Sequence, residues 1–154
     1  MEVAQHALQS CRSIARGLSP VTEAQGGLIA GLRDLVARLK TGSGPALDFT
    51  TGGVTRLGLS PAASDHLFRI AQEALANALR HAKANLIKVR LDIEPASVRL
   101  EICDDGEGLK SAGDATGLGL RTMRYRASLL GAKFQVKRAD PVGTCVVCEC
   151  PQVV

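Results

Sequence analysis

The stretch "IKVRLDIEPASVRLEICDDGEGL", residues 87–109, decides the expected fold. Apolar residues alternate with charged ones on both sides of Glu94-Pro95-Ala96, which is the period of strands that bury one face. We therefore predict an antiparallel hairpin, with strands at about 87–93 and 98–102 and one face toward water. An acidic, glycine-rich segment, 104–108, follows the second strand. A plain turn would explain it, but carboxylates beside flexible backbone also suit a ligand.

Helical and strand patterns flank this hairpin. Apolar residues recur every three or four positions in four segments, which predicts helices at 2–17, about 28–39, 61–82 and about 118–130. Further strands are expected at 47–51 before a Gly52-Gly53 turn, at 134–136, and at 144–150 after a turn at 141–143. The fold class is therefore α+β, a two-layer α/β sandwich with a mixed, mostly antiparallel sheet and helices on one face.

Composition limits the function classes. The chain has 154 residues, of which 45% are apolar, so we expect one globular domain. Its 19 basic and 15 acidic residues are interspersed, and only 3% of residues are aromatic, which argues against direct nucleic-acid binding. No apolar run approaches the ~20 residues needed to cross a bilayer. We expect a cytoplasmic chain without membrane contact of its own, although a longer parent protein could be anchored.

The five cysteines stand at positions 11, 103, 145, 148 and 150. Their spacing supplies no four-ligand zinc set. We therefore expect reduced, buried thiols rather than a metal site, which favours a reducing compartment.

Polar residues line one margin of the expected 61–82 helix. Glu73, Asn77, Arg80 and His81 are spaced three and four apart, so they share one side. An Asn carbonyl can ligate Mg²⁺, and Arg and His side chains can meet phosphate oxygens. Glu73 could orient or deprotonate an attacking group. A solvated polar edge, with Glu73 paired to Arg69 or Arg80, is the alternative interpretation.

Two glycine pairs suit a nucleotide. The Asp104 carboxylate could accept a hydrogen bond from an amine such as adenine N6, and Gly106 and Gly108 would let the backbone approach a flat ring. The acids needed for an EF-hand calcium loop are absent. Gly117 and Gly119 open the next helix, where free amides form an anion site. This is neither a P-loop nor a dinucleotide-binding motif, and a plain glycine-rich helix start remains the alternative.

Three stretches together resemble a known family. "LFRIAQEALANALRHAKA", "DDGEG" and "GLGLRTMRYRASLLGA" occur in the order and spacing of the ATP-binding domain of sensor histidine kinases. This superfamily includes gyrase, heat-shock chaperones and mismatch-repair ATPases, and shares the Bergerat ATP-binding fold. "SIARGLSPV" followed by "GGLIAGLRDLVARL" resembles the junction before that domain in the nitrate-sensor and LuxR-partnered subfamily, and "VGTCVVCECP" resembles its closing strand.

The resemblance implies a domain division and a set of roles. Residues 1–20 would end the dimerisation and phosphoacceptor region, and 21–154 would form the catalytic ATP-binding domain. Asn77 would bind Mg²⁺, Asp104 would recognise adenine, and Glu73 would act as the base. The other implied nucleotide contacts are Gly106, Gly108 and Thr144 around the base, and Arg80, His81, Gly117 and Gly119 near the phosphates. Thr116 would lie in a short ATP lid, 109–116, that orders on nucleotide binding.

The implied reaction moves the γ-phosphoryl group of ATP to a histidine nitrogen, for relay to a response regulator with a receiver domain. The acceptor histidine has no match here. His6 lacks a following acid, and His66 opens the 61–82 helix, where capping or packing is expected. We therefore expect a catalytic fragment that binds ATP and Mg²⁺ but needs its own dimerisation domain as a partner.

Two other functions fit the same fold. An anti-sigma-factor-type serine kinase would act on a partner protein, but the "SIARGLSPV" junction argues against it. A non-catalytic module would have lost nucleotide, which the presence of Asn77, Asp104 and both glycine pairs opposes.

Overall fold

The computed structural model describes residues 27–53, 57–108 and 117–152. The expected helix at 2–17, the lid and Thr116 lie outside these residues. The described elements, in chain order, are α2 (Gly27–Leu39), β1 (Ala46–Gly53), α3 (Pro61–His81), β2 (Leu86–Ile93), β3 (Ser97–Asp104), α4 (Leu118–Leu129), β4 (Lys133–Arg138) and β5 (Thr144–Pro151).

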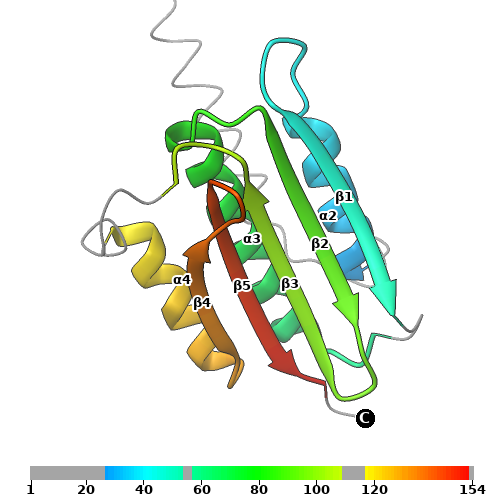
Figure 1. The fold of residues 1–154 in the computed structure, drawn as a ribbon. Helices are drawn as coiled ribbons and strands as arrows, with labels where there is room; N and C mark the ends of the chain where they lie inside the picture. Colours follow the sequence, from blue (N-terminus) through cyan, green and yellow to red (C-terminus); the bar gives the residue numbers. More distant parts are fainter. Residues whose placement is uncertain (1–26, 54–56, 109–116, 153–154) are drawn as a thin grey trace, which may run out of the picture.

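The strands form one mixed sheet in the order β1-β2-β3-β5-β4. β1 runs parallel to β2, and the other neighbouring pairs are antiparallel. Figure 1 shows α2, α3 and α4 on one side of this sheet. The predicted two-layer sandwich is therefore confirmed. We call the opposite side of the sheet the open face, because no described helix covers it.

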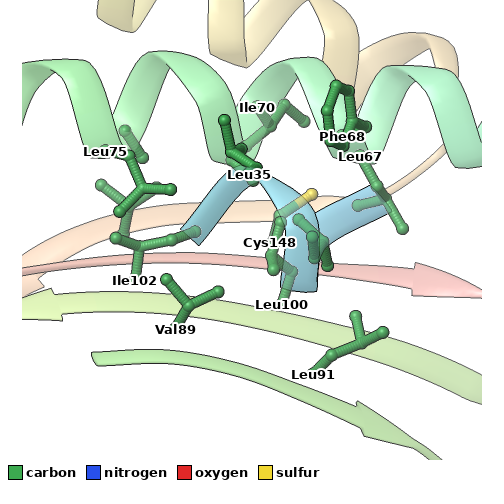
Figure 2. Close-up of a cluster of buried hydrophobic side chains, with 14 of the residues drawn as sticks. Leu35, Leu67, Phe68, Ile70, Leu75, Val89, Leu91, Leu100, Ile102 and Cys148 are labelled. Atoms are coloured by element: carbon green, nitrogen blue, oxygen red, sulfur yellow. The ribbon is translucent and has the colours of Figure 1, made fainter. Parts of the chain in front are cut away.

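The core lies between α3 and the sheet. Ser60 caps α3 by accepting a hydrogen bond from the Ala63 amide at 3.1 Å, and Pro61 occupies the first turn, as predicted. Figure 2 shows Leu67, Ile70 and Leu75 of α3 facing the apolar side chains of β2, β3 and β5. The side chains of Leu67, Ile70 and Leu75 are fully buried. Burial of this stripe fixes the rotation of α3 and so decides which residues lie at its polar margin.

The β2–β3 hairpin forms in the predicted register, with Leu91 opposite Leu100. β3 continues two residues beyond its predicted end, because Asp104 still pairs with Ile87. Side chains of a strand alternate between faces, so Asp104 shares the helix-covered face with Leu100 and Ile102. Asp104, the first acid of segment 104–108, is therefore held in place by the sheet.

The predicted end of β1 is wrong. We expected a turn at Gly52-Gly53, but the strand continues through both glycines, and Gly53 pairs with Ile93. Gly53 has φ +87, and a side chain there would overlap the Ile93 carbonyl. Glycine permits this close parallel pairing, which sequence periodicity does not encode.

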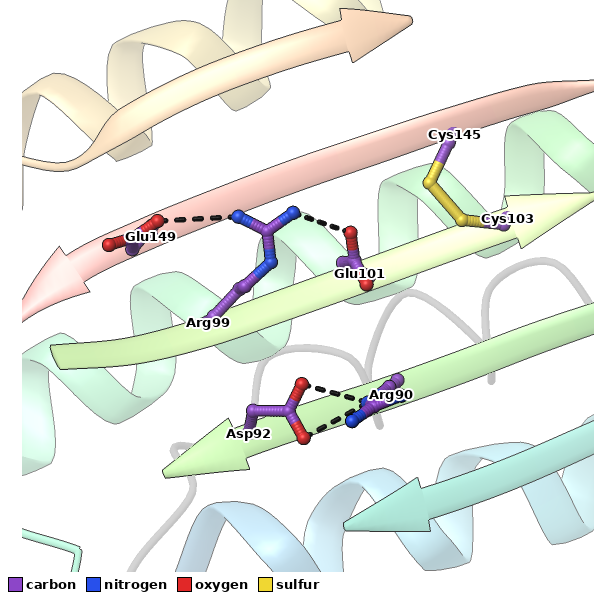
Figure 3. Close-up of polar contacts among 7 residues, drawn as sticks. All are labelled: Arg90, Asp92, Arg99, Glu101, Cys103, Cys145 and Glu149. Carbon is purple, nitrogen blue, oxygen red and sulfur yellow. Dashed lines mark hydrogen bonds and ion pairs between the residues drawn. A yellow bond between two sulfur atoms is a disulfide. The ribbon is translucent and has the colours of Figure 1, made fainter. Parts of the chain in front are cut away.

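Ion pairs cover the open face. Arg99 of β3 donates to Glu101 at 2.7 Å and to Glu149 of β5 at 3.3 Å (Figure 3). Arg90 pairs with Asp92 at 2.8 Å on β2. Partly exposed pairs of this kind contribute about 0–1 kcal/mol each, so their main effect is to keep the uncovered sheet face polar.

The expectation of reduced thiols is wrong for two cysteines. Cys103 of β3 lies directly opposite Cys145 of β5, their Cα atoms are 4.1 Å apart, and they form a disulfide on the open face (Figure 3). The two cysteines are 42 residues apart in the sequence, so their pairing depends on the register of β3 and β5, which cysteine spacing alone does not reveal. Cys148 and Cys150 are buried free thiols, as expected, and Cys11 lies outside the described residues.

Candidate functional site

Four segments meet at one end of the sandwich. The C-terminal half of α3, the end of β3, the start of α4 and the start of β5 lie together there in Figure 1. Each predicted site residue within the described ranges belongs to one of these segments or to the turn that follows β3.

Asp104 is a buried carboxylate held by backbone amides. Its side chain is 7% exposed, and Oδ1 accepts hydrogen bonds from the Gly106 amide at 3.0 Å and the Thr144 amide at 3.2 Å. No hydrogen bond from a described residue reaches Oδ2. A buried carboxylate needs polar partners. The arrangement therefore fixes Asp104 through one oxygen and leaves the other for a ligand donor.

Glycines let three backbone segments close around Asp104. A side chain on Gly106 would overlap the Ala82 carbonyl at the end of α3, and the Glu107 amide donates to that same carbonyl at 2.8 Å. Gly143, with φ +114, packs in the same way against the Asp104 carbonyl. A Cβ on Gly108, with φ +75, would lie 3.0 Å from the Gly143 carbonyl oxygen. The acidic segment therefore joins the end of α3 to the start of β5.

Asp105 has a structural role that the sequence pattern did not predict. Its Oδ1 accepts the Asn85 amide at 2.8 Å and the Leu86 amide at 2.9 Å, which ties the turn to the start of β2. These backbone hydrogen bonds, that of Leu86 most strongly, lower the pKa of Asp105. The available signal was the tendency of Asp in turns to accept backbone amides. Asp105 therefore holds the turn to β2, whereas Asp104 Oδ2 accepts no hydrogen bond from the described residues.

Substituting Asp105 by Asn should make stability less sensitive to acid. The folded pKa of Asp105 lies below the ordinary value of 3.8. Such a carboxyl contributes stability above the unfolded pKa and loses it as the pH falls through the folded pKa. Below about pH 4, the free energy of unfolding should therefore decline more steeply for wild type than for Asp105→Asn. Urea unfolding at several pH values measures both slopes, and equal slopes would contradict this role.

The polar margin of α3 places an acid and an amide together. Glu73 and Asn77 are half-buried, and Arg80 reaches Glu73 Oε1 at 4.0 Å. Of the two ion-pair partners considered for Glu73, the structure therefore has Arg80, while Arg69 pairs with Asp65 at 3.5 Å. His81 is exposed at the end of the helix.

The start of α4 approaches this margin closely. Gly117 is the N-cap and has no side-chain cap, so the first amides of α4 keep their hydrogen-bonding capacity. A Cβ on Gly119 would overlap Glu73 Oε1 and lie 3.2 Å from Asn77 Nδ2. The absence of a side chain at Gly119 thus brings helix amides beside Glu73 and Asn77, an arrangement suited to anionic oxygens.

The predicted residues form two groups joined by the end of α3. Asp104, Gly106, Gly108 and Thr144 make the first, and Glu73, Asn77, Arg80, Gly117 and Gly119 make the second. In the described ranges, no cluster of three His, Cys, Asp or Glu residues could hold a metal. Mg²⁺ bound by Asn77 would therefore need phosphate oxygens as further ligands, which is its usual habit in nucleotide sites.

His66 lies apart from both groups. Its ring Nδ1 is 3.4 Å from the Arg126 guanidinium of α4, so it packs between two helices. The N-cap of α3 is Ser60, so His66 packs between helices and does not cap.

The family of the chain follows from comparison with known proteins. Residues 62–154 match the family described as histidine kinase-, DNA gyrase B- and HSP90-like ATPases. The chain belongs to this ATPase family. The members of this family are ATPases, which use a nucleotide. The predicted resemblance to the ATP-binding domain of sensor histidine kinases is confirmed.

Relatives of this ATPase domain include sensor histidine kinase LiaS of Bacillus subtilis (strain 168), 33% identical over 97% of this chain and 41% of LiaS. The chain thus spans less than half the length of that relative. The ATP binding domain of PrrB from Mycobacterium tuberculosis shares 25% identity with TM-score 0.59, over 82% of this chain and 92% of that one. The histidine kinase domain of the Erythrobacter litoralis EL346 blue-light activated kinase has the same fold, with TM-score 0.68 and 21% identity over 82% of this chain and 61% of that one.

Among the described helices of the ATPase domain, none is long and apolar enough to span a membrane.

Proposed function

We propose that this domain binds Mg-ATP across the two residue groups and transfers the γ-phosphoryl group to a histidine of a separate dimerisation domain. The close approach of Gly119 to Glu73 and Asn77 is the observation that carries the proposal. It puts the amides of a helix start, an acid and an amide side chain within reach of one set of phosphates.

The Asp104 group would bind the base. Asp104 Oδ2 would accept a hydrogen bond from the adenine amino group, while the Gly106 and Thr144 amides hold Oδ1. Gly106 and Gly108, which let the backbone pack against Ala82 and Gly143, would shape the pocket that holds the base. Because these amides hold the carboxylate in place before the ligand arrives, less free energy is spent on ordering its side chain when the ligand binds.

The α3 and α4 group would bind the phosphates. Asn77 would hold Mg²⁺, which when bound neutralises phosphate charge in the transition state. The first amides of α4, beginning after Gly117, would donate to phosphate oxygens, and Arg80 and His81 would lie near them. Glu73 would accept the proton of the attacking histidine or orient its ring. Thr116 would close over the phosphates with the lid.

The partners of the whole protein follow from the same proposal. A dimerisation domain would carry the acceptor histidine, and residues 1–20 would end that region. A response regulator with a receiver domain would then receive the phosphoryl group. On this proposal the domain would act in the cytoplasm, without nucleic-acid or membrane contacts of its own.

Labelled ATP tests the proposal. The chain, incubated with Mg²⁺, ATP labelled on the γ-phosphate and a dimerisation domain bearing the acceptor histidine, should transfer label that resists alkali and is lost in acid. That pattern identifies phosphohistidine, whereas label that resists acid and is lost in alkali would support the serine-kinase alternative. A melting temperature that does not rise in excess Mg-ATP would favour the non-catalytic module, which has lost nucleotide.

A further inference from the structure

The Cys103–Cys145 disulfide adjoins the proposed adenine site. Cys103 immediately precedes Asp104 on β3, and Cys145 immediately follows Thr144 on β5. The Thr144 amide donates to Asp104 Oδ1 at 3.2 Å. The disulfide and this hydrogen bond therefore join the same two strand ends, one on the open face and one toward the helices.

Two lysines flank the disulfide along the sheet. Lys88 of β2 is the direct cross-strand neighbour of Cys103, and Lys137 of β4 is that of Cys145. Directly opposite residues share a face, so four strands place Lys, Cys, Cys and Lys in one row. Both lysines are exposed. Positive charge favours a thiolate, and redox-active cysteines typically occupy such electropositive, partly exposed surroundings.

The other described cysteines are protected from exchange. Cys148 and Cys150 lie on the helix-covered face, buried away from the disulfide. Burial raises the pKa of the Cys148 thiol to about 12 and also raises that of Cys150. Because the thiolate is the attacking species, neither thiol competes for the pair on the open face.

We propose that Cys103 and Cys145 form a redox-modification site that adjusts the affinity of the domain for nucleotide. This inference rests on the proposed function, because it assigns the adenine to Asp104. The oxidised pair holds the ends of β3 and β5 together and so preorganises the Asp104–Thr144 contact. Reduction removes this constraint. Nucleotide binding must then order the two strand ends, which lowers the affinity.

The reductant is a dithiol, such as a thioredoxin-class protein or dithiothreitol. Its thiolate attacks Cys103, which is more exposed than Cys145, with Cys145 only 3% exposed. The Cys103–Cys145 bond breaks, a mixed disulfide forms on Cys103, and Cys145 leaves as a thiolate that takes up a proton. The second thiol of the reductant then releases Cys103. Two electrons and two protons pass to the protein, and the reductant becomes a disulfide.

Titration with Mg-ADP in both redox states tests the inference. Cys11→Ser removes the cysteine outside the described residues and leaves four of the five. After oxidation, alkylation in denaturant should label two cysteines, and after dithiothreitol four. We expect Mg-ADP to bind about fivefold more weakly to the reduced chain, the scale of ordering one or two side chains. Reoxidation should restore the affinity, and Cys103→Ser with Cys145→Ser should match the reduced chain under both conditions.

The possible failures are distinguishable. Four labelled cysteines after oxidation, or equal affinities in the two states, would overturn the redox inference and leave the proposed function standing. Absence of Mg-ADP binding in both states would overturn the proposed function, and the redox inference with it.

Discussion

Asp104→Asn is expected to weaken Mg-ADP binding about 100-fold, the effect of losing one hydrogen bond to a charged group. The Asn side-chain oxygen can still accept the Gly106 and Thr144 amides that now reach Oδ1. The Asn NH₂ group would then stand in the place of Oδ2. Because NH₂ is a donor, it cannot accept the hydrogen bond of the adenine amino group. Isothermal titration calorimetry measures the loss, and urea unfolding measures whether the fold is retained.

The controls separate binding from folding. Asp104→Ala removes the acceptor of both amides, so it should also destabilise the fold, by about 1–3 kcal/mol for each amide left unpaired in a buried site. Asp92→Asn alters an aspartate on the open face and should leave the affinity unchanged. An unchanged affinity for Asp104→Asn would remove Asp104 from the adenine site.

Glu73→Gln is expected to slow phosphoryl transfer to the dimerisation domain by about 10²–10⁴-fold, the usual contribution of a general base. Gln keeps the size and hydrogen-bonding reach of Glu73 beside Gly119, but cannot accept the proton of the attacking histidine. Binding of Mg-ADP should change much less than transfer, because the lost interaction belongs to the transition state. Single-turnover transfer with labelled ATP gives the rate.

A matched variant tests whether charge alone accounts for the effect. Glu101→Gln removes one negative charge from the open face, where Glu101 pairs with Arg99 at 2.7 Å. It should transfer at the wild-type rate. If Glu73→Gln also transferred at that rate, Glu73 would be an ion-pair partner of Arg80 and not the base.

Local signals were enough to predict most of the fold. α3 follows from Ser60-Pro61 and from an apolar repeat long enough to exclude a strand. The β2–β3 hairpin follows from alternation on both sides of a three-residue break. Each of these signals lies within the element that it predicts, so no knowledge of distant contacts was needed.

The missed features depend on register between distant strands. The extension of β1 through Gly53 needs the parallel pairing with β2, and the disulfide needs Cys103 opposite Cys145. The same holds within the site. The sequence predicted Asp104 as a ligand residue, but the use of its two oxygens depends on Thr144, 40 residues away. Asp105 was missed for a different reason, because the tendency of Asp in turns to accept backbone amides does not say which amides it binds.

Titration of the unmodified chain with Mg-ADP, followed by melting temperature, tests the central claim most directly. A ligand that binds only the folded state stabilises it by about 2.7 kcal/mol at 100 times its dissociation constant. For a domain of this size, that corresponds to a rise in melting temperature of roughly 5–10 °C. The account predicts this rise, dependent on Mg²⁺ and much reduced in Asp104→Asn. An unchanged melting temperature at millimolar Mg-ADP would contradict it.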